Sequence, residues 1–527
     1  MSIQKNIQDD SNYSIIKSTS VLSAGTLVSR FLGFFRDIIL ARLLGTGIYA
    51  DAFFVAFRIP NLFRSFVGEG TVNSAVIPVF TECLQKQKKK GFFSLVNHIF
   101  IISFILLILM VILGIVLSPL IVRILAPGFS SVPDKMAVTI RLTQIMFPYL
   151  LFIGMSACCM AALYTLRLFF FPAVSQCIVN LTIIISVVVS ALFIDVPVYG
   201  IACGVVVGGF IQFLLHLYAL FKAGLKLELF SRLYHPGAVK ISRLLMPRMV
   251  GAGVYQLTVF IDTFCASWVN IVGAGGISAI YYANRLIQLP MGVFIIALSS
   301  VLLPVLSGFA DKKDKRSLKK ALCFSLENTF FIMIPAAVFL AIFSYPIIQT
   351  LFQRGEFGPY STHITSKVLL FYALGLPAFG GNKILVTGFH SLQDTKTPVK
   401  IAGLCLGINA LLNVVLMFPL KIGGIALASS MAGIANFFML YRNISNKLNI
   451  NMVDISYIVK IVLSSIIMGI VCVAVWNFLT INQWIRMGIT VILSVLIYLF
   501  ASFLLHIKQT VNIFIWFQKI FWKQKNN

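Results

Sequence analysis

Long apolar segments alternate with short polar connections along the whole chain. Apolar stretches of about 20 residues, the length that spans a hydrocarbon core as a helix, recur at residues 100–117, 178–194, 329–347, 461–478 and 489–505. Together with the more polar segments between them, they predict about 14 transmembrane helices. We therefore expect an all-α membrane protein.

The composition supports a chain folded in lipid. Of the 527 residues, 59% are hydrophobic and 11% charged, and the mean hydropathy is +0.96, far from the values of soluble domains. Residues 1–20 are polar and lack the apolar core of a signal peptide, so the first helix is expected to stay in the mature protein. The nine cysteines are scattered without metal-ligand spacing, and we interpret them as small buried residues.

The net charge of +26 would suggest nucleic acid as the partner of a soluble protein, but here the basic residues follow the membrane topology. With the N-terminus inside, about 25 Lys and Arg fall in connections on one side and about 6 on the other. This positive-inside bias predicts an even number of helices, both termini in the cytoplasm and no nucleic-acid partner. The few basic residues expected outside are Arg123, Lys135, Arg354, Lys367, Lys421 and Arg486.

The chain contains an internal duplication. Residues 200–212 parallel residues 424–436, and Ala56–Arg58 followed by Ile77–Val79 parallels Ala283–Arg285 followed by Leu303–Val305 at nearly the same offset. We infer two parallel repeats of about six helices that form two lobes around a central cavity, plus two C-terminal helices; a duplication kept only for packing is the alternative. The expected domains are a cytoplasmic N-terminal tail (1–17), an N-lobe (18–223), a cytoplasmic linker (224–240), a C-lobe (241–446), helices 13 and 14 (447–506) and a basic tail (507–527).

No segment predicts a soluble catalytic domain. The sequence lacks a G-x-x-x-x-G-K-[ST] phosphate loop, an H-E-x-x-H helix and a G-x-S-x-G elbow, so direct use of ATP is not expected. A membrane glycosyltransferase would need acidic catalytic residues on a large outer loop, and Arg354-Gly-Glu356 and Asp134 are poor candidates. We therefore favour a transporter over an enzyme.

The first two helical segments are unusually charged. A charge at mid-bilayer costs about 2.5–3.5 kcal/mol on an insertion scale, so such residues are expected to face a water-filled cavity or a partner. The alternative is that Arg30 pairs with Asp37 and Arg36 reaches an interface, although pairing alone does not require so many arginines. The charged residues are Arg30, Arg36, Asp37, Asp51, Arg58, Arg64 and Glu69.

Helical spacing brings several of these charges onto one face. Asp51, Arg58 and Glu69 would share a face of an unbroken helix. Pro60 and the neighbouring glycines, however, predict a kink in this helix. Irregular backbone within the membrane is tolerated only where it is buried in protein or lines a cavity. The second repeat adds Arg285, at the position matching Arg58, and Arg248. Because arginine donates two parallel bonds to phosphate oxygens and stays charged at low dielectric, the cavity suits a pyrophosphate.

These segments resemble the MurJ/MviN family of bacterial lipid II flippases, within the superfamily of multidrug, oligosaccharidyl-lipid and polysaccharide exporters. The two most specific matches are Ser29-Arg-Phe-Leu-Gly-Phe-Phe-Arg-Asp37 and residues 50–64, from Ala-Asp-Ala-Phe-Phe to Asn-Leu-Phe-Arg. Further matches lie at residues 68–70, 126–129, 281–286 and 393–400.

The resemblance implies a 14-helix protein of the bacterial inner membrane that carries lipid II, the undecaprenyl-pyrophosphate-linked peptidoglycan precursor, to the outer leaflet by alternating access. Membrane lipids and the cell-wall synthesis machinery are the other partners it suggests. It implies that Arg30, Arg36, Asp51, Arg64 and Arg285 are needed for function and that Arg58 and Glu69 match charged cavity positions. This chain departs from some relatives, because Asn284 stands where they have Asp and Gln288 where they have Glu, so a fixed ion pair at Arg285 is not expected.

Three features leave alternatives open. A flippase for another undecaprenyl-pyrophosphate-linked oligosaccharide, or a multidrug exporter, would share this fold, but multidrug exporters prefer cations and should carry more cavity carboxylates.

No cofactor is expected. Coupling to the membrane potential or to a monovalent cation is one interpretation of Asp262, Asn409 and Asn413, because these residues offer oxygen ligands. The alternative is that they bond to neighbouring helices. The tail from residue 507 predicts an interfacial amphipathic helix or a disordered basic segment.

Overall fold

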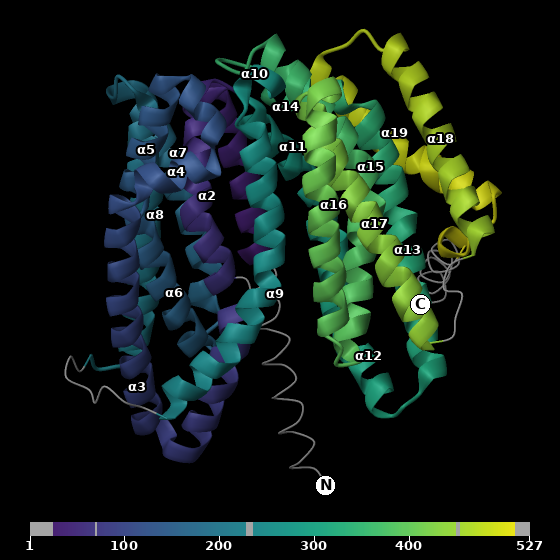
Figure 1. Ribbon diagram of the computed structural model, residues 1–527. Coiled ribbons are helices and arrows are strands. Elements are labelled where there is room, and N and C mark those ends of the chain that lie inside the picture. Colours follow the sequence, from purple (N-terminus) through teal and green to yellow (C-terminus); the bar gives the residue numbers. More distant parts are fainter. Residues whose placement is uncertain (1–24, 69–70, 228–235, 449–453, 512–527) are drawn as a thin grey trace, which may run out of the picture. The chain divides into compact units, whose positions relative to one another are not determined.

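The structure is a computed structural model that describes residues 25–68, 71–227, 236–448 and 454–511. Over these ranges the chain is helical and contains no strand, which confirms the predicted all-α class. Residues 25–44 form the first described helix. The other elements are α2 (Ile48–Gly68), α3 (Thr71–Val116), α4 (Ser118–Leu125), η1 (Pro127–Ser131), α5 (Pro133–Met146), α6 (Pro148–Thr165), α7 (Phe170–Phe193), α8 (Pro197–Lys222), α9 (Pro236–Ala266), α10 (Val269–Val272), α11 (Gly276–Pro290), η2 (Met291–Ile295), α12 (Ile296–Asp311), α13 (Lys315–Ile342), α14 (Ser344–Phe352), α15 (Pro359–Ser391), α16 (Lys396–Leu420), α17 (Ile422–Leu448), α18 (Ile455–Phe478) and α19 (Gln483–Leu504) (Figure 1).

Among the described residues, 11 helices are long and apolar enough to cross a membrane, so the protein is a multi-span membrane protein. The predicted total of 14 is reached if helix 25–44, α2 and α9 also cross. These three helices carry the intramembrane charges expected from the sequence, which lowers their hydropathy. The number 14 therefore stays a prediction.

The basic segment after Glu82 makes a sharp turn within α3. Lys88 has a left-handed φ of 55° and a ψ of −167°, so α3 consists of two helices joined at this point. Lys residues 86 and 88–90 surround the turn, as expected for a cytoplasmic connection under the positive-inside rule. The second of the two helices contains residues 100–116 of the apolar segment predicted at residues 100–117.

Local sequence signals explain where several helices begin. Proline stands at the start of α5, α6, α8 and α15, where the missing N–H would have no helical partner. Side chains cap three others: Asp314 accepts from Ser317 N at the start of α13, Asp454 caps α18 and Asn482 caps α19. The hydrogen bond from Ser317 N–H also lowers the pKa of Asp314, because it favours the ionised carboxylate.

The chain divides into two compact units. Unit 1 runs to Val269 and includes Arg354–Glu356, while unit 2 comprises Asn270–Gln353 and the chain from Phe357 onward. The division falls after α9, because α9 packs on α2 and α3, whereas the repeat predicts a boundary before this helix. The lobe boundaries inferred from the repeat stay a prediction.

Arg354–Glu356 joins unit 1 through the end of helix 25–44. Glu356 N donates to the carbonyl oxygen of Arg42 at 2.9 Å. Gly45 has φ +56° and a Cβ at this residue would overlap the Glu356 carbonyl, so the turn requires glycine both for its left-handed backbone and for this close approach. This backbone contact gives a structural role to the Arg-Gly-Glu segment.

The two copies of the repeat use their first glycine in the same way. A Cβ on Gly200 of α8 would overlap Ser190 of α7, and a Cβ on Gly424 of α17 would overlap Leu416 of α16. Each glycine therefore allows its helix to approach the preceding one closely, as is typical of helix packing in membranes.

A second pair of equivalent glycines contacts an aromatic ring two helices earlier in each copy. Gly209 lies against the ring of Tyr149 in α6, and Gly433 lies against the ring of Phe379 in α15. The helix neighbours correspond as well, since α8 packs on α6 and α7 while α17 packs on α15 and α16. Each unit thus contains the same three-helix arrangement at the matching segments of sequence, as expected from a duplication.

Candidate functional site

Most of the charges predicted to bind substrate lie on two helices of unit 1. Arg30, Arg36 and Asp37 belong to helix 25–44, and Asp51 and Arg58 belong to α2. Arg285 lies on α11 in unit 2. Arg64 is part of α2, but its side chain, like that of Arg248, is not among those described, and Glu69 lies outside the described residues.

Arg36 and Asp37 form a buried ion pair that a neighbouring helix completes. The exposed fraction is 7% for Arg36 and 0% for Asp37. Asp37 Oδ1 accepts from Arg36 Nη2 at 2.7 Å and from Nε at 3.0 Å. Arg36 Nη1 donates to Asn180 Oδ1 of α7 at 3.0 Å, and Asn180 Nδ2 donates to the Ser29 carbonyl at 3.0 Å. The guanidinium is therefore held by its own helix and by α7.

Arg30 has a different environment from Arg36. Its side chain is half-buried, and among the described residues it makes no hydrogen bond or ion pair. The alternative that Arg30 pairs with Asp37 is wrong, because Asp37 pairs with Arg36 instead. Five N–H donors are thus available on a helix with a bilayer-spanning length, which suits an anionic ligand.

Asp51 forms a buried ion pair that the sequence did not suggest. Lys135 Nζ of α5 lies 2.6 Å from Asp51 Oδ2, and the exposed fractions of these side chains are 3% and 1%. The same ammonium lies 4.1 Å from the centre of the Phe129 ring. Both residues stand in the first turn of their helices, so the pair ties the start of α2 to the start of α5.

Arg58 contacts α9 within unit 1. Its Nη1 donates to the Val259 carbonyl oxygen at 3.3 Å and to Thr263 Oγ1, while Thr263 Oγ1 donates to the same carbonyl at 2.6 Å. The Arg58 side chain is half-buried, so this contact leaves part of it accessible. The Arg58 guanidinium is therefore held by uncharged oxygen acceptors of α9, one backbone carbonyl and one hydroxyl, and not by a carboxylate among these contacts.

Arg285 lies beside a tyrosine of its own helix. Its Nη2 donates to Tyr281 Oη at 2.8 Å, and the guanidinium carbon lies 5.0 Å from the centre of the Tyr281 ring. Asn284 is half-buried and Gln288 is exposed. The aromatic ring attracts the cation without carrying an opposite charge, and the neighbouring Asn284 and Gln288 side chains are uncharged.

The three residues proposed for a cation belong to different units. Asp262 of α9 is 7% exposed and lies in unit 1. Asn409 and Asn413 of α16 lie in unit 2, where Asn413 Nδ2 donates to Asn409 Oδ1 at 3.1 Å and Asn409 Nδ2 donates to Ser429 Oγ of α17 at 3.3 Å. Within the described part of the chain, no cluster of three or more His, Cys, Asp or Glu side chains could hold a metal ion. The cation site stays a prediction.

Sequence reasoning missed three residues that hold the predicted charges, namely Lys135, Asn180 and Thr263. Lys135 was assigned to an outer connection, yet it is buried against Asp51. The signal available for Asn180 was that it is the single amide within the apolar stretch at residues 178–194, since such a group must find a partner in lipid. Thr263 directly follows Asp262 and gives no separate signal, because threonine is common in transmembrane helices.

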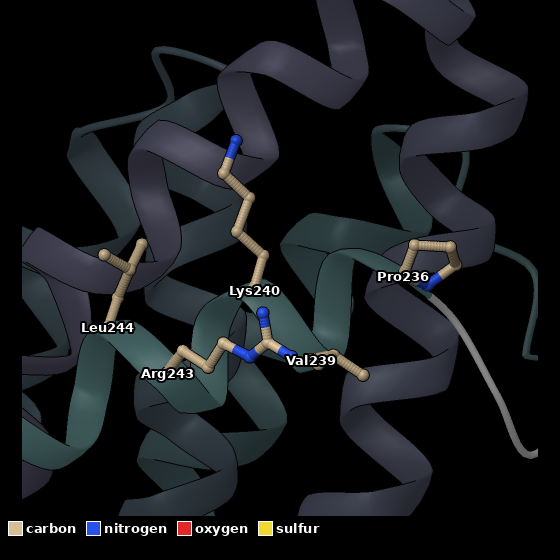
Figure 2. Close-up of a pocket in the computed structure, with 5 residues that line it drawn as sticks. All are labelled: Pro236, Val239, Lys240, Arg243 and Leu244. Atoms are coloured by element: carbon tan, nitrogen blue, oxygen red, sulfur yellow. The ribbon is translucent and has the colours of Figure 1, made fainter.

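A basic pocket lies at the start of α9, at a different position from the charged face of α2. It has a volume of about 520 Å³ and is lined by Pro236, Val239, Lys240, Arg243 and Leu244 (Figure 2). Lys240 Nζ also contacts Glu82 Oε2 of α3 at 2.5 Å. The pocket contains none of the residues predicted to bind substrate.

Comparisons with known proteins agree with this arrangement. A protein-family model described as lipid II flippase MurJ matches residues 40–500. A protein of Buchnera aphidicola subsp. Acyrthosiphon pisum named a probable lipid II flippase MurJ is 33% identical over 503 residues, which cover 94% of this chain and 98% of the relative. The lipid II flippase MurJ of Burkholderia cenocepacia is 32% identical over 437 residues, which cover 82% of this chain and 84% of that protein.

Solved structures extend the comparison to the fold. A lipid II flippase MurJ in an inward closed conformation superposes with a TM-score of 0.78 at 29% identity, covering 92% of this chain and 98% of that one. An inward-facing multidrug transporter of the MATE family has a TM-score of 0.68 at 13% identity, and the superposition covers 82% of this chain and 98% of the transporter. At this low identity the similarity is one of fold alone. Since the family model spans residues 40–500 and a relative at 33% identity covers nearly the full length of both chains, the chain belongs to the lipid II flippase MurJ family.

Proposed function

We propose that this protein is a transporter, not an enzyme, that moves lipid II from the cytoplasmic to the outer leaflet of the bacterial inner membrane for peptidoglycan synthesis. The observation that carries the proposal is the family match along almost the whole chain, residues 40–500. The arginines within the helices of that region add a chemical reason, because lipid II is attached to its carrier through a pyrophosphate. Both termini would lie in the cytoplasm, as the positive-inside bias predicts.

Arg30 and Arg285 are the arginines that we propose to contact the pyrophosphate first. Arg30 makes no hydrogen bond to a described residue, and Arg285 is supported by a tyrosine ring and hydroxyl. Arg58 and Arg64 would add positive charge along α2. The carboxylates Asp37, Asp51 and Glu69 repel an anion and would instead fix the positions of cations, as Asp37 does for Arg36.

The transport cycle that we propose is alternating access by the two repeats, which expose the same arginines to one leaflet and then to the other. The membrane potential acts on each elementary charge with about 2.3 kcal/mol per 100 mV, so a cycle that moves these cations, or a monovalent cation held by Asp262, would gain direction. Asp262→Asn would then weaken ion-stimulated transport and spare lipid II binding. Asn409 and Asn413 of α16 are the other oxygen ligands that we propose for a monovalent cation.

The experiment that tests the proposal is transport of lipid II by the purified protein in liposomes, together with rescue of cells depleted of their own flippase. Arg30→Ala and Arg285→Ala should abolish transport while the proteins insert normally, because they remove pyrophosphate donors and leave the apolar surface intact. Arg123→Ala is the matched control, since Arg123 is exposed at the end of α4. Normal transport by Arg285→Ala would refute its assignment.

The same assay separates the other functions. Another undecaprenyl-pyrophosphate-linked oligosaccharide would be transported in place of lipid II if the chain were a flippase for a different glycan, and a cationic drug would be exported if it were a multidrug transporter. Contacts with the cell-wall synthesis machinery would appear as cross-links between this protein and a peptidoglycan polymerase in growing cells. We expect lipid II to be the substrate that accumulates on the cytoplasmic leaflet when the protein is depleted.

A further inference from the structure

Asp51 and Lys135 form an ion pair that is almost completely enclosed. The Nζ to Oδ2 distance is 2.6 Å, and both side chains are at least 97% buried. The Phe129 ring covers the ammonium at 4.1 Å. A ligand in a cavity cannot reach a carboxylate with 1% exposure unless the helices separate, so direct binding of substrate by Asp51 does not follow from this geometry.

Local electrostatics make the two residues depend on each other. Both lie in the first turn of a helix, where the macrodipole favours an anion such as Asp51 and disfavours a cation such as Lys135. Removing Asp51 leaves the buried Lys135 ammonium without this carboxylate, and removing Lys135 takes from Asp51 a buried cation; either loss is more damaging than replacing both charges together. Lys135 is therefore held at an unfavourable helix end by Asp51.

The pair also determines the orientation of the helix that carries Arg58. Asp51 and Arg58 are seven residues apart on α2, which places them on nearly the same face at 3.6 residues per turn. Arg58 contacts Val259 and Thr263 of α9. Fixing Asp51 on α5 thus fixes both the rotation and the height of the face that presents Arg58.

We infer that Lys135 and Asp51 form a positioning pair that sets α2 on α5, and that Asp51 serves transport through Lys135 instead of by contact with the substrate. The inference rests on the proposed lipid II transport for its functional half only. The structural half is an energetic coupling between two side chains, which stability measurements detect without any substrate. A failure of the proposed function is therefore distinguishable from a failure of this pair.

The test uses the full-length protein and three variants: Asp51→Asn, Lys135→Gln and the double variant that carries both changes. We expect each single variant to transport lipid II at least about tenfold more slowly, because a buried charge loses its partner. The double variant should recover most of the rate, since a neutral amide pair can hydrogen-bond in the same place. The affinity for lipid II, measured by native mass spectrometry, should change by less than about threefold in every variant, because the pair does not touch the ligand.

The matched control is Asp134→Asn, since Asp134 precedes Lys135 in the first turn of α5 but is exposed. It should leave the rate unchanged and lower the stability much less than either single variant, because an exposed first-turn carboxylate contributes only about 0.3–1 kcal/mol through the helix dipole. If a single variant fails to insert, recovery of insertion and of cooperative unfolding in the double variant supports the pair. The inference is overturned if Lys135→Gln transports normally while Asp51→Asn and the double variant are equally inactive, or if the double variant is no more stable than the worse single one, because Asp51 would then act independently of Lys135.

Discussion

Exchanging arginine for lysine at positions 30 and 36 should separate a binding charge from a structural one. Both substitutions keep the positive charge and both residues lie on helix 25–44. Arg36 uses three N–H groups, two to Asp37 and one to Asn180, whereas Arg30 makes no hydrogen bond to a described residue. A lysine has a single ammonium and cannot reproduce the planar fork at position 36.

The structure gives the size of the effect. Lysine at position 36 can keep one contact with Asp37 but loses the bridge to Asn180, a charged hydrogen bond whose loss lowers the free energy of unfolding by about 1.5–3 kcal/mol. Alanine at position 36 leaves the Asp37 carboxylate, 0% exposed, without its cation and should lower the free energy of unfolding by about 3–5 kcal/mol. Arg30→Lys should change stability by less than about 0.5 kcal/mol.

The assay is reversible unfolding in mixed detergent micelles, combined with lipid II transport in liposomes. We expect Arg36→Lys to lose stability and Arg30→Lys to keep stability but transport more slowly, because a bidentate phosphate contact is replaced by a single one. Asn180→Ala completes a double-mutant cycle with Arg36→Lys, in which a coupling energy of about 1 kcal/mol or more is expected for residues in direct contact. Full stability of Arg36→Lys, or no coupling to Asn180→Ala, would contradict the buried bridge.

Three further predictions concern contacts elsewhere in the protein. Gly204→Val should lower the free energy of unfolding by about 1–3 kcal/mol, because a Cβ at this position of α8 would overlap Ser186 of α7. Gly208→Ala is the control and should be tolerated, since its Cβ would lie 3.5 Å from the nearest atom. Thermal unfolding of both variants tests this prediction, and equal stabilities would contradict it. Burial raises the pKa of Asp394, but hydrogen bonds from Lys447 and Thr397 outweigh this and hold the pKa well below its usual range. Asp394→Ala should lower the free energy of unfolding by about 0.5–2 kcal/mol at neutral pH, mostly through the lost hydrogen bonds to Thr397 at the start of α16. The difference from the unchanged protein should disappear as the pH falls below about 4 and through the lowered pKa of the folded state, because the unfolded chain then binds the proton more readily. A difference in stability that grows at low pH would contradict this reasoning. Tyr281→Phe removes the hydroxyl that accepts from Arg285 Nη2 but keeps the ring, so the transport rate should fall about five- to tenfold. Tyr345→Phe is the control and should transport normally, because Tyr345 is an exposed residue of α14.

The sequence by itself determined the class of fold and the chemistry of the charged helices. Runs of apolar residues long enough to cross a bilayer are a local property of the chain, and 11 such helices are present among the described residues. The duplication was visible because the same small residues recur where helices approach closely, as at Gly200 and Gly424. Intramembrane arginines were identifiable because lipid penalises a charge wherever its helix packs.

Only the tertiary structure decided which partner each charge has. Helical periodicity places Asp51 and Arg58 on one face of α2, but it does not determine which helices pack against that face. In the structure Asp51 contacts α5 and Arg58 contacts α9. The alternative pairing of Arg30 with Asp37 is not formed, because adjacent Arg36 reaches the same carboxylate and also contacts Asn180. Lys135 and Asn180 are separated by many residues from the charges they hold, and such contacts depend on helix rotation and packing that a linear pattern does not encode. A sequence therefore reveals where charge must be compensated, because the bilayer imposes that requirement locally, whereas the compensating group is selected by the long-range packing of helices.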